Sequence, residues 1–191
     1  DELKRLAKAV SDGLSPDNIP ACMILIAIYT GARFSEILGL TWDDINFKNK
    51  TIRINKTWDY HNHQGFLPTK TPHSIRTIRV NSMLLNKLKQ LNDNHSGRIF
   101  KIVTAPYFNE KVNDALKHYL SVAGINKKGF HFHSLRHSHV AYLLSQGVDL
   151  YAISKRLGHA NMSITSNVYA YFIDEYKRKS DNLIESKLDK L

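Results

Sequence analysis

The first forty residues have apolar positions at helical spacing and are predicted to form three helices. Residues 2–12 make a short charged segment, residues 20–30 are mostly apolar, and residues 33–40 keep a helical repeat that ends near Gly39. Pro20 suits the first turn of the second segment, because the missing proline N–H would have no partner there. The apolar segment 20–30 is therefore expected to be a buried helix.

The pattern changes between residues 42 and 80, where strands are predicted. The stretches "WDDINF", "TIRINKTWDY" and "SIRTIRV" are rich in Ile, Thr and Val and alternate apolar with polar or basic residues. This alternation is typical of a sheet with one solvated face. Residues 61–73, between the second and third stretches, contain Gly and Pro and are expected to form a long turn.

Helical spacing returns at Asn81. The chain of 191 residues has the length of one domain. The predicted fold class is α+β: a mainly helical domain with a small three-stranded antiparallel sheet near residues 42–80. The later helices, most of them separated by glycines, are expected near residues 81–92, 106–122, 133–146, 149–157, 161–170 and 174–189.

The charge of the chain indicates the kind of partner. Lys and Arg number 27 against 17 for Asp and Glu, which gives a formal net charge of +10. Such an excess favours an anionic partner, with nucleic acid ahead of an acidic membrane surface. Seven basic residues and one acid lie between residues 48 and 80, so the sheet is expected to face that partner. A merely solvated strand face would have the same composition.

Cys22 is the single cysteine and lies in the apolar run "ACMILIAIY". No disulfide can form within the chain, which favours a reducing compartment. The run is too short to span a bilayer. We therefore expect a bacterial cytoplasmic protein, associated with the nucleoid and without membrane attachment. Cys22 itself is expected to be a core residue rather than a nucleophile.

The stretch "HSLRH", residues 133–137, groups several side chains with chemical potential. On a helix, His133 and Arg136 lie at i and i+3 on one face. His133 and His137 also have the spacing of helical zinc ligands, but the glutamate of the protease motif is absent and only one cysteine is available. A phosphate pocket uses Arg136 better, because its planar guanidinium matches two phosphate oxygens. Unremarkable surface histidines are the third alternative.

Further candidate cations lie elsewhere in the chain. Arg33 begins a helix after "TGA", where free backbone N–H groups favour an anion, and Glu36 one turn later can hold its guanidinium. Lys70 lies at the tip of the turn "PTKTPH", and His159 follows Gly158 at a helix break. Taken singly, each has an ordinary interpretation as a surface ion pair or a solvated side chain.

Two tyrosines near the C-terminus are candidate nucleophiles. A tyrosine hydroxyl, with a pKa near 10, is a poor nucleophile unless cations stabilise the phenolate. Tyr169 follows His159 by ten residues, and Tyr171 lies two positions further on. Two positions correspond to about 200° round a helix, so only one of the two can face a given pocket. Ordinary aromatic packing is the alternative for both.

Together these blocks resemble a known family. "TGARFSEILGLTWDDI", "TKTPHSIRTIRV", "HSLRHSHVAYLLSQG", "ISKRLGHANMSIT" and "NVY" stand in the order found in the catalytic domain of the tyrosine recombinases, the phage-integrase family. The resemblance implies that residues 1–173 are the catalytic domain. The family's N-terminal DNA-binding region is absent, which suggests a truncated chain. Residues 174–191 form a predicted helical tail with an apolar stripe, expected to dock on a neighbouring subunit or to fold back: Ile184, Leu188 and Leu191.

The resemblance also implies a role for each candidate residue. Arg33 and Arg136 would clamp the non-bridging oxygens of the scissile phosphate, and Tyr169 would attack the phosphorus to give a 3′-phosphotyrosine and a free 5′-hydroxyl. Lys70 would be the general acid, and His133 and His159 would assist proton transfer and orient the phosphate. Two residues are expected to support the site, Glu36 and His137. Four basic residues are expected to contact DNA: Arg53, Lys56, Arg76 and Arg79.

The function implied is that of a site-specific DNA recombinase, the integrase of a phage or conjugative element. Its partners would be double-stranded DNA at element-end and target sites, other copies of the chain in a tetramer, and accessory bending or directionality factors. No Gly-rich nucleotide loop or carboxylate cluster suited to Mg²⁺ is evident, so neither metal nor cofactor is expected. The alternatives are a type IB topoisomerase, a non-catalytic DNA-binding module and a histidine-based zinc protein.

Overall fold

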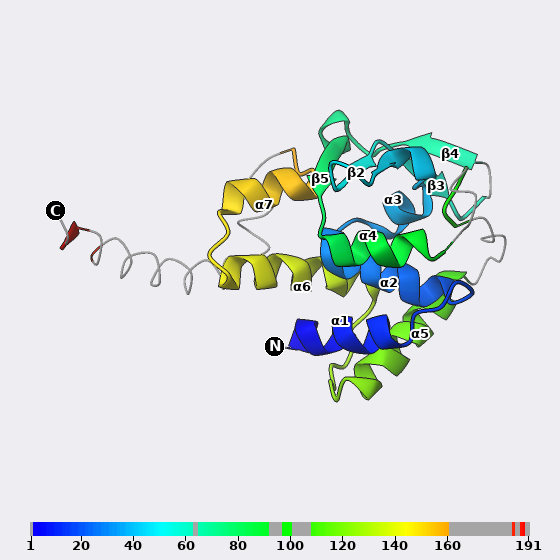
Figure 1. Cartoon of the computed structure of the whole chain (residues 1–191), viewed down its shortest axis with the longest axis horizontal. Coiled ribbons are helices and arrows are strands. Elements are labelled where there is room, and N and C mark those ends of the chain that lie inside the picture. The colour runs from blue at the N-terminus through cyan, green and yellow to red at the C-terminus, as the bar shows by residue number, and fades with distance from the viewer. Residues whose placement is uncertain are drawn as a thin grey trace.

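The computed structural model describes residues 2–62, 65–91, 97–100 and 108–160, together with Glu185, Leu188 and Asp189. Helices predominate in these residues, and short strands lie between α3 and α4 (Figure 1). The elements in chain order are α1 (Glu2–Asp12), α2 (Ile19–Thr30), α3 (Phe34–Leu38), η1 (Trp42–Asp44), β1 (Ile45–Asn46), β2 (Thr51–Ile54), β3 (Lys56–Asp59), β4 (Gly65–Pro68), η2 (Pro72–Ser74), β5 (Arg76–Arg79), α4 (Ser82–Lys89), α5 (Phe108–Val122), α6 (Phe132–Ser145) and α7 (Leu150–Leu157).

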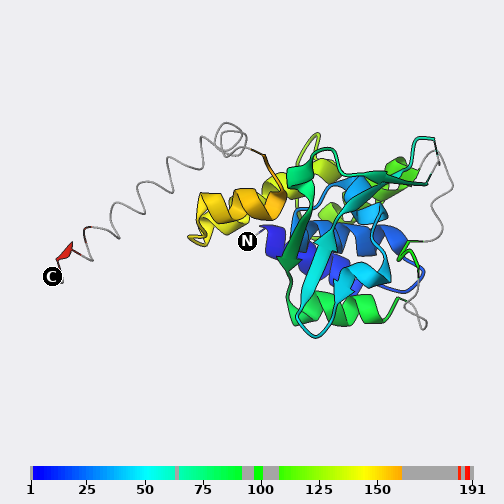
Figure 2. The same ribbon diagram turned by 90° about the horizontal axis from the view of Figure 1, so that it is seen from above.

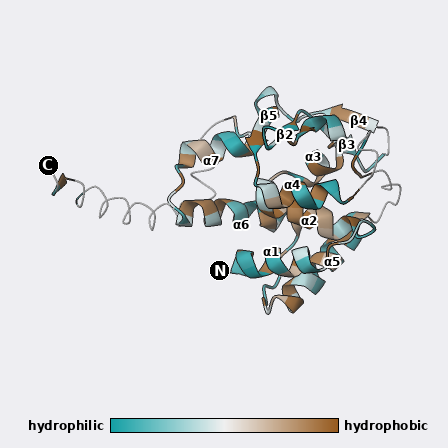
Figure 3. Ribbon diagram, in the orientation of Figure 1, coloured by the Kyte–Doolittle hydropathy of each residue, from teal (hydrophilic) through white to brown (hydrophobic). Residues whose placement is uncertain are grey.

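Helix α2 is the centre of the fold. The side chain of Asn18 caps its start by accepting a hydrogen bond from the Ala21 N–H, and Gly31 ends it in the left-handed region at φ 65°. Nearly every residue between these caps is buried, because α1, α3, α4, α5 and α6 all pack against it. Figure 3 shows α2 as a largely apolar helix inside the molecule. The prediction of a buried helix over residues 20–30 is confirmed.

The predicted three-stranded antiparallel sheet is present, with the strand order β1-β2-β5. Ile52 pairs with Ile78 across β2 and β5, and both side chains are buried, whereas their neighbours Arg53 and Thr77 are exposed. One face of the sheet therefore covers the helices and the other is solvated, as the alternation predicts. Figure 2 looks onto the strands, which cross over the N-terminal helices.

The region around this sheet differs from the prediction in two ways. Residues 65–68, expected within a long turn, form β4 and pair with β3 in a separate two-stranded sheet. Phe66 and Leu67 are both exposed, so β4 has no buried alternate positions that would reveal it in the sequence. Residues 42–44, expected in a strand, form the 3₁₀ turn η1, because Asp44 caps this turn by accepting hydrogen bonds from the Thr41 N–H and hydroxyl.

The later helices place the C-terminal part of the described chain. A small apolar cluster joins α6 to α7, formed by Val140, Leu144, Ile153 and Leu157. The helices expected near residues 81–92, 106–122, 133–146 and 149–157 are observed with shorter or slightly shifted bounds. Those expected at 161–170 and 174–189 lie largely outside the described residues. The α+β fold class is confirmed, with a two-stranded sheet added.

The apolar helix α2 contains the single cysteine of the chain. Cys22 is a buried residue of α2, and burial raises the pKa of its thiol to about 12. A thiol in this state is protonated at neutral pH and packs as an apolar group, in agreement with the expected core role. Within the described ranges, no helix is long and apolar enough to cross a membrane.

Candidate active site

Arg136 is the central cation of the candidate site. It lies on α6 and is only 4% exposed. Its Nη1 donates to the carbonyl of Gly31 at 2.6 Å, and its Nη2 donates to the carbonyl of Leu157 at 2.8 Å. Gly31 ends α2 and Leu157 ends α7, so the ends of two helices fix the direction of the guanidinium. A guanidinium fixed in this way can receive an anion without reorganising.

The imidazole of His159 completes one side of this arrangement. Its Nε2 lies 2.9 Å from Nη2 of Arg136, and because arginine can only donate, Nε2 must be the acceptor. Burial, together with the charges of Arg136, Arg33 and Arg76, lowers the pKa of His159 to about 4. His159 is therefore neutral at neutral pH with its proton on Nδ1. In that state it can donate a hydrogen bond to an anion, but it is not a ready source of protons.

Glu36 organises the other arginines. Its carboxylate is 2% exposed and accepts hydrogen bonds from the backbone N–H and the Nη1 of Arg33, both at 2.8 Å. It also accepts from Nη1 and Nη2 of Arg76, at 3.1 and 2.9 Å. Burial alone raises the pKa of Glu36, but the hydrogen bonds and charges of Arg76 and Arg33 outweigh it and hold the pKa at about 2. The supporting role expected of Glu36 stays a prediction, and these hydrogen bonds are the contacts through which it would act.

Arg76 does not suit the DNA contact expected of it. Its side chain is buried, and besides the pair with Glu36 its Nε donates to the carbonyl of Arg156 at 2.7 Å. Residue 76 has the same phase in β5 as the buried Ile78, so its side chain points toward the helices. The expectation is wrong for Arg76, which is part of the internal framework instead.

The two histidines of "HSLRH" lie together on the exposed side of α6, whereas a third histidine of this helix is buried. His133 is exposed, and burial of part of its ring together with the charges of His137 and Arg136 lowers its pKa. His137 was expected to support the site from behind, but it is exposed and its ring lies edge-on to His133 at 5.1 Å between centroids. The buried histidine is His139, at 4% exposure. Its i+3 spacing from Arg136 could have revealed it, because residues at that spacing share a helix face.

His139 is expected to make the folded state sensitive to mild acid. Burial, with the charge of Arg156, lowers the pKa of His139 to about 4, whereas the unfolded chain has the ordinary pKa of 6.5. Between these values the unfolded state binds a proton that the folded state excludes, so stability falls as the pH falls through 6.5 toward 4. We expect His139 to remove roughly 2 kcal/mol between pH 7 and pH 5.

Urea denaturation at both pH values measures this effect. Other histidines contribute to the same slope, so the relevant quantity is the difference between the wild-type chain and His139→Phe, which has no titratable group there. The change in unfolding free energy between the two pH values should be smaller in the variant. Equal slopes for the two proteins would contradict the assignment.

The other predicted site residues are exposed, paired elsewhere in the protein, or outside the described residues. Lys70 lies exposed in the turn between β4 and η2, and its ammonium makes no hydrogen bond or ion pair with another described residue. Tyr169, like Tyr171, lies outside the described residues. Of the expected DNA contacts, Arg53 and Arg79 are exposed on the same face of the sheet. Lys56 is partly buried and ion-paired with Asp44, so it is engaged within the protein.

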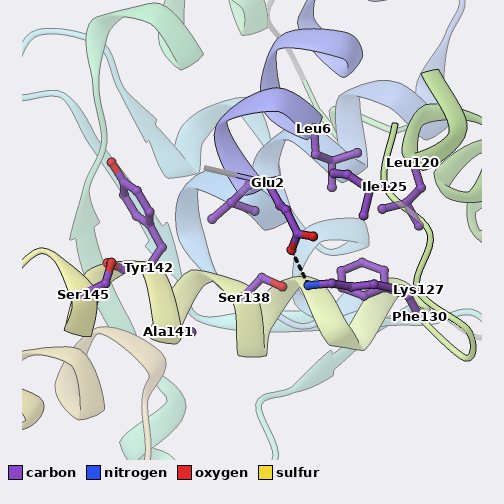
Figure 4. A pocket seen from close by; sticks show the side chains of 11 residues that line it. Glu2, Leu6, Leu120, Ile125, Lys127, Phe130, Ser138, Ala141, Tyr142 and Ser145 are labelled. Carbon is purple, nitrogen blue, oxygen red and sulfur yellow. Dashed lines mark hydrogen bonds and ion pairs between the residues drawn. The ribbon is translucent and has the colours of Figure 1, made fainter. Parts of the chain in front are cut away.

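A cleft beside Arg33 and His133 has room for part of a substrate. It has a volume of about 270 Å³, and its lining includes Arg33, His133, Tyr60 and Asn113. A larger cavity of about 440 Å³ lies between α1 and α6, where Glu2 and Lys127 form an ion pair (Figure 4). Its α6 lining includes Ser138, about 200° round the helix from Arg136, so it is separate from the candidate site. Among the described residues, no group of three or more His, Cys, Asp or Glu side chains is placed to hold a metal ion.

Comparisons with known proteins give one consistent result. The model of the phage integrase family matches residues 1–174. The integrase of Staphylococcus phage L54a is 34% identical over 85% of this chain and 49% of its own length. The XerC-like tyrosine recombinase of Caldanaerobacter subterraneus is 30% identical over 89% of this chain and 50% of its own length. The chain thus spans about half the length of these curated relatives.

Solved structures match the fold. The Tn1549 transposon integrase, in complex with transposon right end DNA, aligns with a TM-score of 0.69 and 21% identity, covering 93% of this chain and 64% of that one. The XerA recombinase aligns with a TM-score of 0.69 and 21% identity, covering 96% of this chain and 62% of that one. At this level of identity the matches establish the architecture of the domain.

Proposed function

Because the chain belongs to the phage integrase family, we propose that it is the catalytic part of a site-specific DNA recombinase that works through a 3′-phosphotyrosine. The observation that carries this proposal is the fixed position of Arg136, held by the Gly31 and Leu157 carbonyls beside His159. A buried cation with two rigid acceptors and a neutral imidazole beside it is suited to the extra negative charge of a phosphoryl-transfer transition state.

The reaction follows from the roles of these groups. The Tyr169 oxygen attacks the scissile phosphorus while its hydroxyl proton passes to a base, which we assign to His133, and the bond from phosphorus to the 5′ oxygen breaks. Arg136 and Arg33 stabilise the non-bridging oxygens, and the Nδ1–H of His159 donates to one of them. The departing 5′ oxygen takes the electron pair and a proton, which we assign to Lys70. Rejoining is the reverse attack by a 5′-hydroxyl on the phosphotyrosine, which conserves the phosphodiester energy, so no nucleotide is consumed.

The substrate we propose is double-stranded DNA at the ends of a mobile element and at its target. The relatives are named integrase and tyrosine recombinase, and the Tn1549 integrase was solved with transposon DNA. The exposed Arg53 and Arg79 lie on one face of the sheet, where they can neutralise phosphates. The same proposal includes a homotetramer on DNA, accessory bending or directionality factors and a nucleoid location. It also includes a catalytic domain over residues 1–173 and a docking tail over residues 174–191.

Covalent trapping tests this function. The protein is mixed with nicked duplexes that carry candidate element-end sequences, in the presence of EDTA, and denatured samples are examined for a protein–DNA adduct. We expect an adduct with the wild-type chain, none with Tyr169→Phe, and an unchanged amount with Tyr171→Phe. An adduct that survives Tyr169→Phe but not Tyr171→Phe would move the nucleophile. DNA binding without any adduct would overturn the enzymatic assignment in favour of a binding module.

A further inference from the structure

Arg156 joins three elements directly behind the candidate site. It is the last but one residue of α7 and is partly buried. Its Nη1 donates to the carbonyl of Arg79 in β5 and its Nη2 to the carbonyl of Tyr29 in α2, both at 2.9 Å. Its Nε donates to Nε2 of His139 in α6 at 3.2 Å. All three nitrogens of the guanidinium therefore bond to groups of the protein itself.

The contact with His139 requires one protonation state of that imidazole. Its Nδ1 lies 2.8 Å from the carbonyl of Ile28, which can only accept, so Nδ1 bears the proton. Its Nε2 is then the acceptor that Arg156 needs. His139 is buried, so leaving its Nε2 without a donor would be costly. The need of His139 Nε2 for a donor therefore holds the Nε of Arg156 in this position.

The position of Arg156 determines where the next residues of the chain lie. Leu157 follows it and supplies the carbonyl that holds Nη2 of Arg136, and His159 is two residues further on. The contact between Gly31 and the end of α7 is tight: a Cβ atom at Gly31 would lie 2.8 Å from His139 and 2.9 Å from Leu157. A shift of the α7 end relative to α2 must therefore move the acceptors of Arg136.

We propose that Arg156 is a positioning residue for the cleavage reaction, acting through the Leu157 carbonyl and His159 on Arg136. Arg156 touches neither the phosphate nor the nucleophile in this account. It holds the end of α7 against α2, β5 and α6, so that the Arg136 guanidinium and the His159 imidazole face the same point. This inference rests on the proposed recombinase function.

The test compares Arg156→Met with Lys155→Met. The two substitutions remove one positive charge each from adjacent residues, and Lys155 is exposed and makes no contact with the Arg136 network. In single-turnover cleavage of the nicked substrate, Arg156→Met is expected to be about 10- to 100-fold slower than the wild-type chain. Lys155→Met should stay within about twofold, and the Kd for DNA should be the same for both variants.

A modified substrate separates positioning from a general loss of structure. A methylphosphonate at the scissile position replaces one charged non-bridging oxygen with a methyl group, so there is less charge for Arg136 to stabilise. If Arg156 acts through Arg136, the rate loss caused by Arg156→Met should shrink to less than about threefold on this substrate. Equal losses on both substrates would overturn the proposal, as would equal rates for the two variants.

A measurement without DNA keeps the proposal separate from the proposed function. The side-chain ¹⁵N resonances of His159 report whether Nε2 accepts a hydrogen bond from Arg136. We expect the Nε2 resonance to shift in Arg156→Met and to stay unchanged in Lys155→Met, with thermal denaturation used to confirm that each variant is folded. An unchanged His159 resonance in Arg156→Met would overturn the positioning role, whether or not the chain cleaves DNA.

Discussion

Replacing Arg136 with lysine is expected to lower the rate of covalent DNA cleavage by roughly 10³-fold. The guanidinium uses separate nitrogens for the Gly31 and Leu157 carbonyls, which fixes the orientation of its plane. A lysine has one ammonium, which cannot hold both carbonyls and an anion together. The measurement is the single-turnover rate of adduct formation on the nicked substrate at saturating protein.

The Kd for the same DNA separates chemistry from binding in this experiment. Phosphates along the whole duplex supply most of the affinity, so one substitution should change the Kd by no more than about threefold. The unpaired carbonyls are also expected to destabilise the fold, by about 1–3 kcal/mol each. The rates must therefore be measured at a temperature where the variant is folded. A variant that cleaves at the wild-type rate would exclude Arg136 from the transition state.

Replacing Glu36 with alanine is expected to lower the unfolding free energy by about 3–5 kcal/mol. The substitution leaves Arg76 buried at 9% exposure without its counter-charge, and it removes the acceptor of the Arg33 N–H. Urea denaturation at neutral pH measures the loss. Because the pKa of Glu36 is held at about 2, its contribution is present above its ordinary pKa of 4.5 and disappears only as the pH falls toward 2.

A double-mutant cycle tests the physical reason. If the loss comes from an uncompensated buried charge, the pair Glu36→Ala and Arg76→Met should be less destabilising than the sum of the single variants, by at least about 1 kcal/mol. Glu36→Gln gives a second comparison, since it keeps the shape but removes the charge and turns one acceptor oxygen into a donor NH2 group. Additive losses would mean that Glu36 stabilises the fold mainly through the helix start at Arg33.

The parts of the fold that the sequence predicts are those with a buried face. Helix α2 is recognisable because nearly every position in it is apolar, and β2 and β5 because inward Ile residues alternate with outward polar ones. Strand β4 has no such alternation of buried and exposed residues, since Phe66 and Leu67 are both exposed. The strand is defined by its backbone pairing with β3. Local composition cannot report a pairing that depends on the partner strand.

In the candidate site, too, some residues were predicted from the sequence and others were not. Arg33, Arg136 and His159 are brought into one neighbourhood, and it was the resemblance of their sequence blocks to a known family that selected them. The framework behind them was not predicted. Nothing about Arg156 in the sequence indicates that its guanidinium reaches carbonyls more than seventy residues away, at Arg79 and Tyr29. Such contacts arise from the packing of α7 against β5 and α6, which the order of residues alone does not specify.

The central position of α2 has a consequence for how the protein is made. Its apolar surface is covered by α1 before it in the chain, but also by α4, α5 and α6, and α6 ends only at Ser145. A ribosome must therefore synthesise more than a hundred further residues before the last of these covers exists. During that interval the nascent chain exposes one of its most apolar segments, so its early stages of folding depend on transient shielding of that helix.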